Sequence, residues 1–233
     1  MNLRQLISTK KWQLQKQETI EEKEQMLKEI AKEKTKGKIK DELKALALFL
    51  ALLASAVGGR VALQYVPSVE PIIPLAIIAG LIFGVKEGFL LGGTAYIISN
   101  FFIWGMQGPW TIFQAFGAAM PGAFAGIWGK LRIPNWKDVM ILSVIGTAFF
   151  EMVMNIAGPL MGIGLTIGLF AIPLYFITSL PFSIVHVGSN AIFARIFSPL
   201  LKLRRKKDEF KIISIARSNG SERTNIRMYK SEQ

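Results

Sequence analysis

The chain has 233 residues, a mean hydropathy of +0.37, 51% hydrophobic residues and a formal net charge of +12. It contains no cysteine, which excludes disulfide bonds and thiolate metal sites. The positive excess lies at the two ends: residues 1–44 hold 12 Lys and Arg against 8 Asp and Glu, and residues 200–233 hold 10 against 4. This placement indicates attraction to anionic lipid headgroups rather than to nucleic acid. The apolar middle predicts a membrane protein, because stretches of about 20 apolar residues can cross a bilayer.

Residues 1–42 form a polar segment rich in Lys, Glu and Gln. Opposite charges four residues apart, as at Glu24 and Lys28, favour a helix over residues 14–30. The apolar residues of this segment keep no heptad spacing. We interpret it as a charged cytoplasmic segment that is solvated or lies on the membrane surface, rather than as a docking helix. We expect no cleavable signal peptide, because the first apolar run starts only near Leu43.

Residues 43–201 are predicted to form a membrane domain of six transmembrane helices, followed by a basic tail over residues 202–233. A Pro-rich loop over residues 66–74 separates the first two helices, because proline biases the preceding residue away from helix. Pro173 and Pro181 are expected to kink or divide the last helix, and residues 158–164 to form the turn before it. The predicted helices are residues 43–66, 75–85, 88–104, 110–130, 139–156 and 166–197.

Positive charge alternates from one predicted connection to the next. Lys86 lies in the second connection, Lys130, Arg132 and Lys137 lie in the fourth, and the third and fifth carry no Lys or Arg. Since cytoplasmic loops are enriched in Lys and Arg, this pattern predicts six spans with both termini in the cytoplasm. Five or seven spans would place one basic end on the outside. The predicted fold is therefore an all-α, multi-pass protein of the plasma membrane.

Polar side chains within membrane spans are costly, and they mark either functional sites or contacts between helices. Most of them are predicted to lie in the outer half of the membrane; Asn100, for example, is about 18 Å from the cytoplasmic end of its helix. A solute-binding pocket at this level is predicted from Arg60, Gln64, Glu70, Asn100, Trp104, Trp110, Gln114, Glu151 and Asn155. In the alternative interpretation, Arg60 pairs with Glu70 or Glu151, the amides bond between helices, and the aromatic residues form an interfacial belt.

His186 and Asn190 are predicted to lie deeper, toward the cytoplasm, because their helix runs inward. We interpret His186 as a residue that hydrogen-bonds between helices. An intramembrane enzyme using Glu151 and His186 is an alternative function, although their predicted difference in depth argues against a shared site. The sequence has no Walker A, His-Glu-x-x-His or Gly-x-Ser-x-Gly motif. We therefore expect no enzyme activity, no cofactor and no metal site.

Small residues recur at intervals of four on the first predicted helix, at Ala47, Ala51 and Ser55. This spacing gives a smooth helix face on which another helix can pack closely. The packing partner is either another protein or a helix of the same chain.

The motifs between Arg60 and Gln114 together resemble the S components, the substrate-binding membrane subunits of energy-coupling factor (ECF) vitamin transporters. The resemblance is to the branch that includes cobalamin-type and unassigned vitamin transporters, and it covers residues 43–201. The long charged N-terminal segment departs from the short one usual in the family. The stretches that carry the resemblance are Val66-Pro67-Ser68-Val69-Glu70-Pro71, Ala79-Gly80-Leu81-Ile82-Phe83-Gly84, Ser99-Asn100-Phe101-Phe102 and Gln107-Gly108-Pro109-Trp110-Thr111 with Gln114.

The resemblance implies a subunit that captures a vitamin or related small molecule, with cobalamin as the leading candidate, at the outer face of a prokaryotic plasma membrane. The loop over residues 66–74 would close over the solute. A membrane T subunit and two ATPase subunits would be its partners, and Ala47, Ala51 and Ser55 would form the T-subunit interface. Metal transport is disfavoured, because the chain begins Met1-Asn2-Leu3 without the Met-x-His motif of the metal-specific members. A structural or assembly membrane protein is a further alternative.

Overall fold

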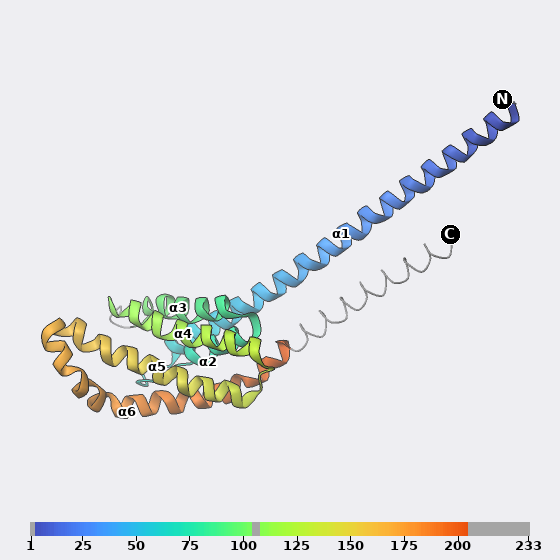
Figure 1. The fold of residues 1–233 in the computed structure, drawn as a ribbon. Helices are drawn as coiled ribbons and strands as arrows, with labels where there is room; N and C mark the ends of the chain where they lie inside the picture. Colours follow the sequence, from blue (N-terminus) through green and yellow to red (C-terminus); the bar gives the residue numbers. More distant parts are fainter. Residues whose placement is uncertain (1–2, 104–107, 205–233) are drawn as a thin grey trace. The chain divides into compact units, whose positions relative to one another are not determined.

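The computed structural model describes residues 3–103 and 108–204, with side chains described from residue 21 onward (Figure 1). The structure divides into two compact units, Met1–Leu48 and Phe49–Gln233. Every regular element in the described part of the chain is helical. These elements are α1 (Leu3–Ala62), α2 (Ile72–Phe83), α3 (Val85–Asn100), α4 (Trp110–Leu131), α5 (Trp136–Gly162), α6 (Leu165–Phe197) and the 3-10 helix η1 (Ser198–Leu201).

Three helical stretches are long and apolar enough to cross a membrane: Glu21–Ala62, Trp136–Gly162 and Leu165–Arg204. α2 is a shorter apolar helix. The prediction of an all-α protein with long apolar helices is therefore confirmed for the described residues. The number of spans and the side on which each terminus lies stay predictions.

The observed helix ends correct several predicted boundaries. α4 begins at the predicted residue and ends one residue later. α2 begins earlier than predicted, so Pro74 lies in its first turn, where the missing N–H costs no helical hydrogen bond. The predicted turn over residues 158–164 is wrong, because α5 continues to Gly162 with Pro159 inside it. The turn is reduced to Ile163 and Gly164, and the φ of +84° at Gly164 suits a residue without a Cβ.

α6 is continuous through Pro173 and Pro181, so the prolines do not divide it. Figure 1 shows that its first part (gold) runs at an angle to its second part (orange). Proline is a common cause of such bends, because it removes one helical hydrogen bond and crowds the preceding turn. This bend decides which residues of α6 come level with those of α5.

α2 is the buried centre of the second unit, in contact with α3, α4, α5 and α6. Its side chains from Ile72 to Leu81 are at most 2% exposed. A helix that is apolar all round is stable only where other helices cover every face, which is the environment of α2.

Glycines bring α2, α3 and α4 unusually close together. A Cβ placed on Gly80 of α2 would overlap the backbone carbonyl of Gly122 in α4, and a Cβ on Gly122 would overlap the carbonyl of Gly88 in α3. Small residues allow this approach of one backbone to another. The close contact fixes α3 and α4, which carry part of the site described next.

Candidate functional site

The centre of the site is His186 on α6, the only histidine in the sequence. Its Nδ1 lies 2.6 Å from Oε1 of Glu151 on α5, and its Nε2 lies 3.1 Å from Oε1 of Glu70, just before α2. His186 is 3% exposed and Glu70 is 6% exposed. A neutral imidazole has only one N–H, so both contacts are hydrogen bonds at once only when the ring carries two protons or one carboxyl group is protonated.

Other donors hold each carboxylate in place. The Ser183 hydroxyl donates to Oε2 of Glu151 at 2.5 Å. The Tyr96 hydroxyl donates to Oε1 of Glu70 at 2.9 Å, and the backbone N–H of Ile72 donates to Oε2 at 3.1 Å. Ser183 and His186 are three residues apart and therefore share one face of α6. Glu70 has three hydrogen-bonding partners and Glu151 has two, so Glu70 is the more completely satisfied carboxylate.

Arg60, near the end of α1, joins the site through Tyr96. Its guanidinium carbon lies 4.3 Å from the centre of the Tyr96 ring, a cation–π contact. Its Nη1 donates to the Ser99 hydroxyl and to Oδ1 of Asn100, each at 2.6 Å. Within the described part of the chain no ion pair joins Arg60 to Glu70 or Glu151, so this part of the alternative interpretation is wrong. The aromatic ring and two neutral acceptors hold the arginine instead.

The side-chain amide of Asn100 connects α3 to α4. It donates to the Thr111 hydroxyl at 2.7 Å and to Oε1 of Gln114 at 2.8 Å. This contact agrees with the interpretation that amides bond between helices. Together these side chains form what we call the buried polar network: Arg60, Glu70, Tyr96, Ser99, Asn100, Thr111, Gln114, Glu151, Ser183 and His186.

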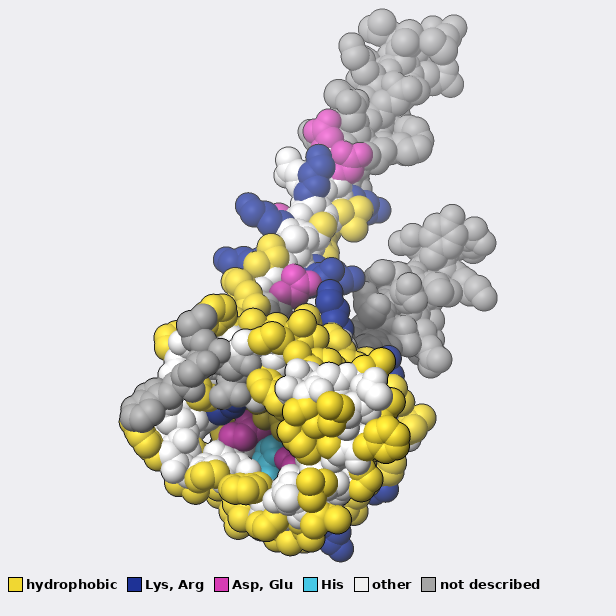
Figure 2. Space-filling model, turned by 90° about the vertical axis from the view of Figure 1, so that its left-hand side faces the viewer, with side chains coloured by type: hydrophobic (Ala, Val, Ile, Leu, Met, Phe, Trp, Pro, Cys, Tyr) yellow, Lys and Arg dark blue, Asp and Glu magenta, His cyan; other side chains and the backbone are white. Residues whose placement is uncertain are grey.

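The network lies beneath an opening in the second unit. Figure 2 shows a hollow rimmed by hydrophobic side chains, with Asp or Glu side chains and histidine at its base. It faces the end of the unit where the α3–α4 and α5–α6 connections lie (Figure 1). The Glu151 side chain is 18% exposed, against 8% for Glu70 and 4% for His186. Glu151 is therefore the most accessible member of the central trio.

The nine predicted binding residues do not all meet. Arg60, Glu70, Asn100, Gln114 and Glu151 belong to the network. Among the described residues, none of the hydrogen bonds joins the other predicted side chains to it. Their positions are as follows: Oε1 of Gln64 is buried without a hydrogen-bond partner, Trp110 lies close to Gly158, Asn155 is 6% exposed, and Trp104 lies outside the described residues.

The prediction that His186 lies deeper than Glu151 is wrong. At about 1.5 Å per residue, His186 is about 32 Å along α6 from its start, whereas Glu151 is about 17 Å from the end of α5. A straight pair of helices would separate them by about 15 Å. Because the first part of α6 runs at an angle to the rest, the helix advances less along the direction of α5 than a straight helix would. The His186 ring therefore reaches the level of Glu151.

The nine predicted binding residues did not include His186 or four further network members: Tyr96, Ser99, Thr111 and Ser183. Three of them had a signal in the sequence, namely helical spacing from a residue already singled out. Tyr96 is four residues before Asn100, Thr111 is three before Gln114, and Ser183 is three before His186. Hydroxyl groups are common enough in apolar helices that this spacing alone does not single them out.

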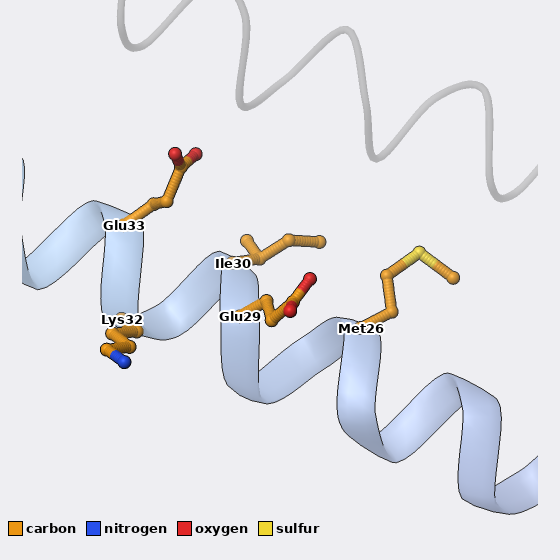
Figure 3. A pocket seen from close by; sticks show the side chains of 5 residues that line it. All are labelled: Met26, Glu29, Ile30, Lys32 and Glu33. Atoms are coloured by element: carbon orange, nitrogen blue, oxygen red, sulfur yellow. The ribbon is translucent and has the colours of Figure 1, made fainter.

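A recess along α1 in the first unit does not resemble a site. Figure 3 shows its lining residues, Met26, Glu29, Ile30, Lys32 and Glu33, all from neighbouring turns of one helix. All five are exposed. In residues 21–103 and 108–204, no group of three or more His, Asp and Glu side chains is placed to hold a metal ion.

Comparison of the chain with protein-family models, with curated proteins and with solved structures gives no match.

Proposed function

We propose that the chain is the substrate-binding subunit of an ATP-driven importer of the ECF type, and that it captures a vitamin or related small molecule outside a prokaryotic cell. The observation that carries this proposal is the buried polar network beneath an apolar-rimmed hollow. Ligand sites are typically mostly apolar concavities with a few convergent polar groups. Cobalamin stays the leading candidate, because its many amide groups suit a site built of carboxylate and amide acceptors.

The charge pattern supports an outward-facing hollow. It opens toward the α3–α4 and α5–α6 connections, which contain no Lys or Arg. Lys130 and Lys137 flank the α4–α5 connection at the other end of these helices, and Lys86 lies at the start of α3. Positive residues favour the cytoplasmic side. Six spans with both termini in the cytoplasm would therefore turn the hollow to the outside.

Residues 66–71, the part of the predicted loop over residues 66–74 that precedes α2, are the proposed lid over a bound solute. This segment carries Glu70, which contacts His186, and its Ser68 carbonyl accepts a hydrogen bond from the Ser189 hydroxyl of α6 at 3.2 Å. Ser68 has a φ of +59°, in the left-handed region. The segment thus both contributes a site residue and binds the helix on the far side of the site.

The partners would be a membrane T subunit and two ATPase subunits. In the second unit Ala51 and Ser55 are exposed, whereas Leu52 and Ala56 are buried at 4% and 0%. In the first unit Ala47 is exposed. Small exposed side chains allow a partner helix to approach closely, which supports Ala51 and Ser55 as part of the T-subunit interface.

Native mass spectrometry of the detergent-purified chain, after incubation with a vitamin panel that includes cobalamin, tests the proposed function. A bound vitamin-sized mass is expected. Its occupancy should fall in Glu151→Ala, which removes the accessible carboxylate, and in Asn100→Ala, which releases Arg60 and Gln114. Glu33→Ala, an exposed acid on α1, is the matched control and should retain the ligand. An apo mass under every condition would count against the proposal and favour a structural or assembly protein.

A second candidate function, an intramembrane enzyme, is favoured by the contacts of His186 with two carboxylates. Histidine is the side chain most often used for general acid–base catalysis. Stoichiometric binding without turnover of the bound compound supports the importer subunit. Conversion of that compound, abolished by His186→Gln, would support the enzyme instead.

A further inference from the structure

We propose that the solute binds Glu151 through N–H donors, as a protonated nitrogen base or a primary amide, and that the site rejects solutes that present a carboxylate or phosphate and no N–H donor. This inference rests on the proposed function and names the substrate class of the same site. Two features of the site support this inference: Glu151 is the most accessible polar group of the central trio, and Arg60 and His186 already have hydrogen-bonding partners.

The accessible group at the base of the hollow is an acceptor. A carboxylate offers about four acceptor positions, and Glu151 uses two of them, for Ser183 and His186. Its side chain is also the most exposed of the central trio, at 18%. Glu151 can therefore take at least one further N–H donor from a solute without losing an existing partner.

Arg60 and His186 are less accessible to a solute than Glu151. Arg60 is 8% exposed, donates twice from Nη1, and lies against the Tyr96 ring. His186 is 3% exposed, with each ring nitrogen facing a carboxylate oxygen. An anion would have to displace these bonds before it met a positive charge.

Charge reinforces this difference. An anionic solute entering the hollow would approach the Glu151 carboxylate first, and like charges at short distance in a poorly hydrated site repel strongly. A protonated amine or amidine would instead make a charge-assisted hydrogen bond there, the stronger kind of hydrogen bond. A primary amide supplies the donor without the charge, which keeps cobalamin within the predicted class.

The test measures ligand-induced thermal stabilisation and affinity of the full chain in detergent with two kinds of probe. Pyridoxamine carries N–H donors on a cationic ammonium group, and cobalamin carries them on primary amides. Nicotinate presents a carboxylate and has no N–H donor at neutral pH. We expect stabilisation by at least one of the first two probes and none by nicotinate. For a cationic binder, Glu151→Gln should weaken affinity about tenfold or more, and the matched change Glu33→Gln should leave it within about twofold.

The selectivity of the unmodified protein is the primary result, so the test does not depend on whether Glu151→Gln folds. Stabilisation by nicotinate, or unchanged affinity for a cationic probe in a folded Glu151→Gln, would overturn the inference while leaving the importer function intact. If none of the probes binds, both the inference and the proposed function fail.

Discussion

His186 is held in a more constrained way than most buried histidines. Its two nitrogens face two carboxylates from different parts of the chain, and each carboxylate has a second donor of its own. Groups connected in this way resist rearrangement one at a time, because each loss leaves a buried partner unsatisfied. The network therefore positions Glu151 rigidly at the base of the hollow.

Tyr96→Phe tests the cost of breaking this network at a single atom. The change removes the hydroxyl that donates to Glu70 but keeps the ring, which stacks on Phe150 at 5.2 Å and lies under Arg60. We expect the free energy of unfolding to fall by about 1–2 kcal/mol, the usual cost of leaving a buried acceptor short of a donor. Denaturation of the purified protein by titration with SDS measures the change. Tyr175→Phe on α6 is the control, and an equal loss there would show that the Glu70 contact is not the cause.

At the residue scale, the sequence predicted site residues where a polar side chain interrupts an apolar helix. Asn100, Gln114 and Glu151 stand out by that criterion, Glu70 stands out as the one acid of its Pro-rich loop, and all four belong to the network. The partner of Arg60 could not be predicted, since the choice between a carboxylate and the ring of Tyr96 depends on the positions of three helices.

At the scale of elements, the close packing of α2, α3 and α4 depends on a few glycines. The sequence predicted these helices and some of their ends, since periodicity and proline act locally. The contacts between Gly80, Gly88 and Gly122 depend on pairing across the structure, which the spacing of glycines along one helix does not reveal. The bend in α6 was anticipated from its prolines, but its direction, which brings His186 to Glu151, was not.

Gly122→Ala tests this packing. The added methyl would overlap the carbonyl of Gly88, so α3 and α4 must separate, and we expect a loss of about 1–3 kcal/mol in the free energy of unfolding. Gly58→Ala on α1 is the matched control, because nothing lies within 4 Å of its added Cβ. That change should be neutral or stabilising by up to about 1 kcal/mol, since alanine favours helix over glycine. Similar losses in both variants would contradict the packing argument.

At the scale of the whole molecule, the prediction that matters most is the orientation of the chain in the membrane. The chain has no cysteine, so single cysteines can be introduced without removing any. Ile133 lies in the α4–α5 connection and is 75% exposed, and Ile163 lies in the α5–α6 connection and is 45% exposed. Six spans place the first inside the cell and the second outside.

Labelling of intact cells with a membrane-impermeant maleimide measures this orientation. We expect Ile163→Cys to react in intact cells and Ile133→Cys to react only after the cells are opened. Reaction of both in intact cells would contradict the proposed topology, and the reversed pattern would turn the hollow toward the cytoplasm.

In the proposed membrane orientation, the buried α2 helix would also limit the passage of ions. It runs from the polar network toward the opposite end of the second unit, and its side chains from Ile72 to Leu81 are shielded from water. An ion that reached Glu151 through the hollow would find no hydrated route alongside this helix, and moving a bare charge into hydrocarbon-like surroundings is costly. In the proposed orientation, α2 would therefore keep ions from crossing the membrane beside the exposed Glu151 carboxylate.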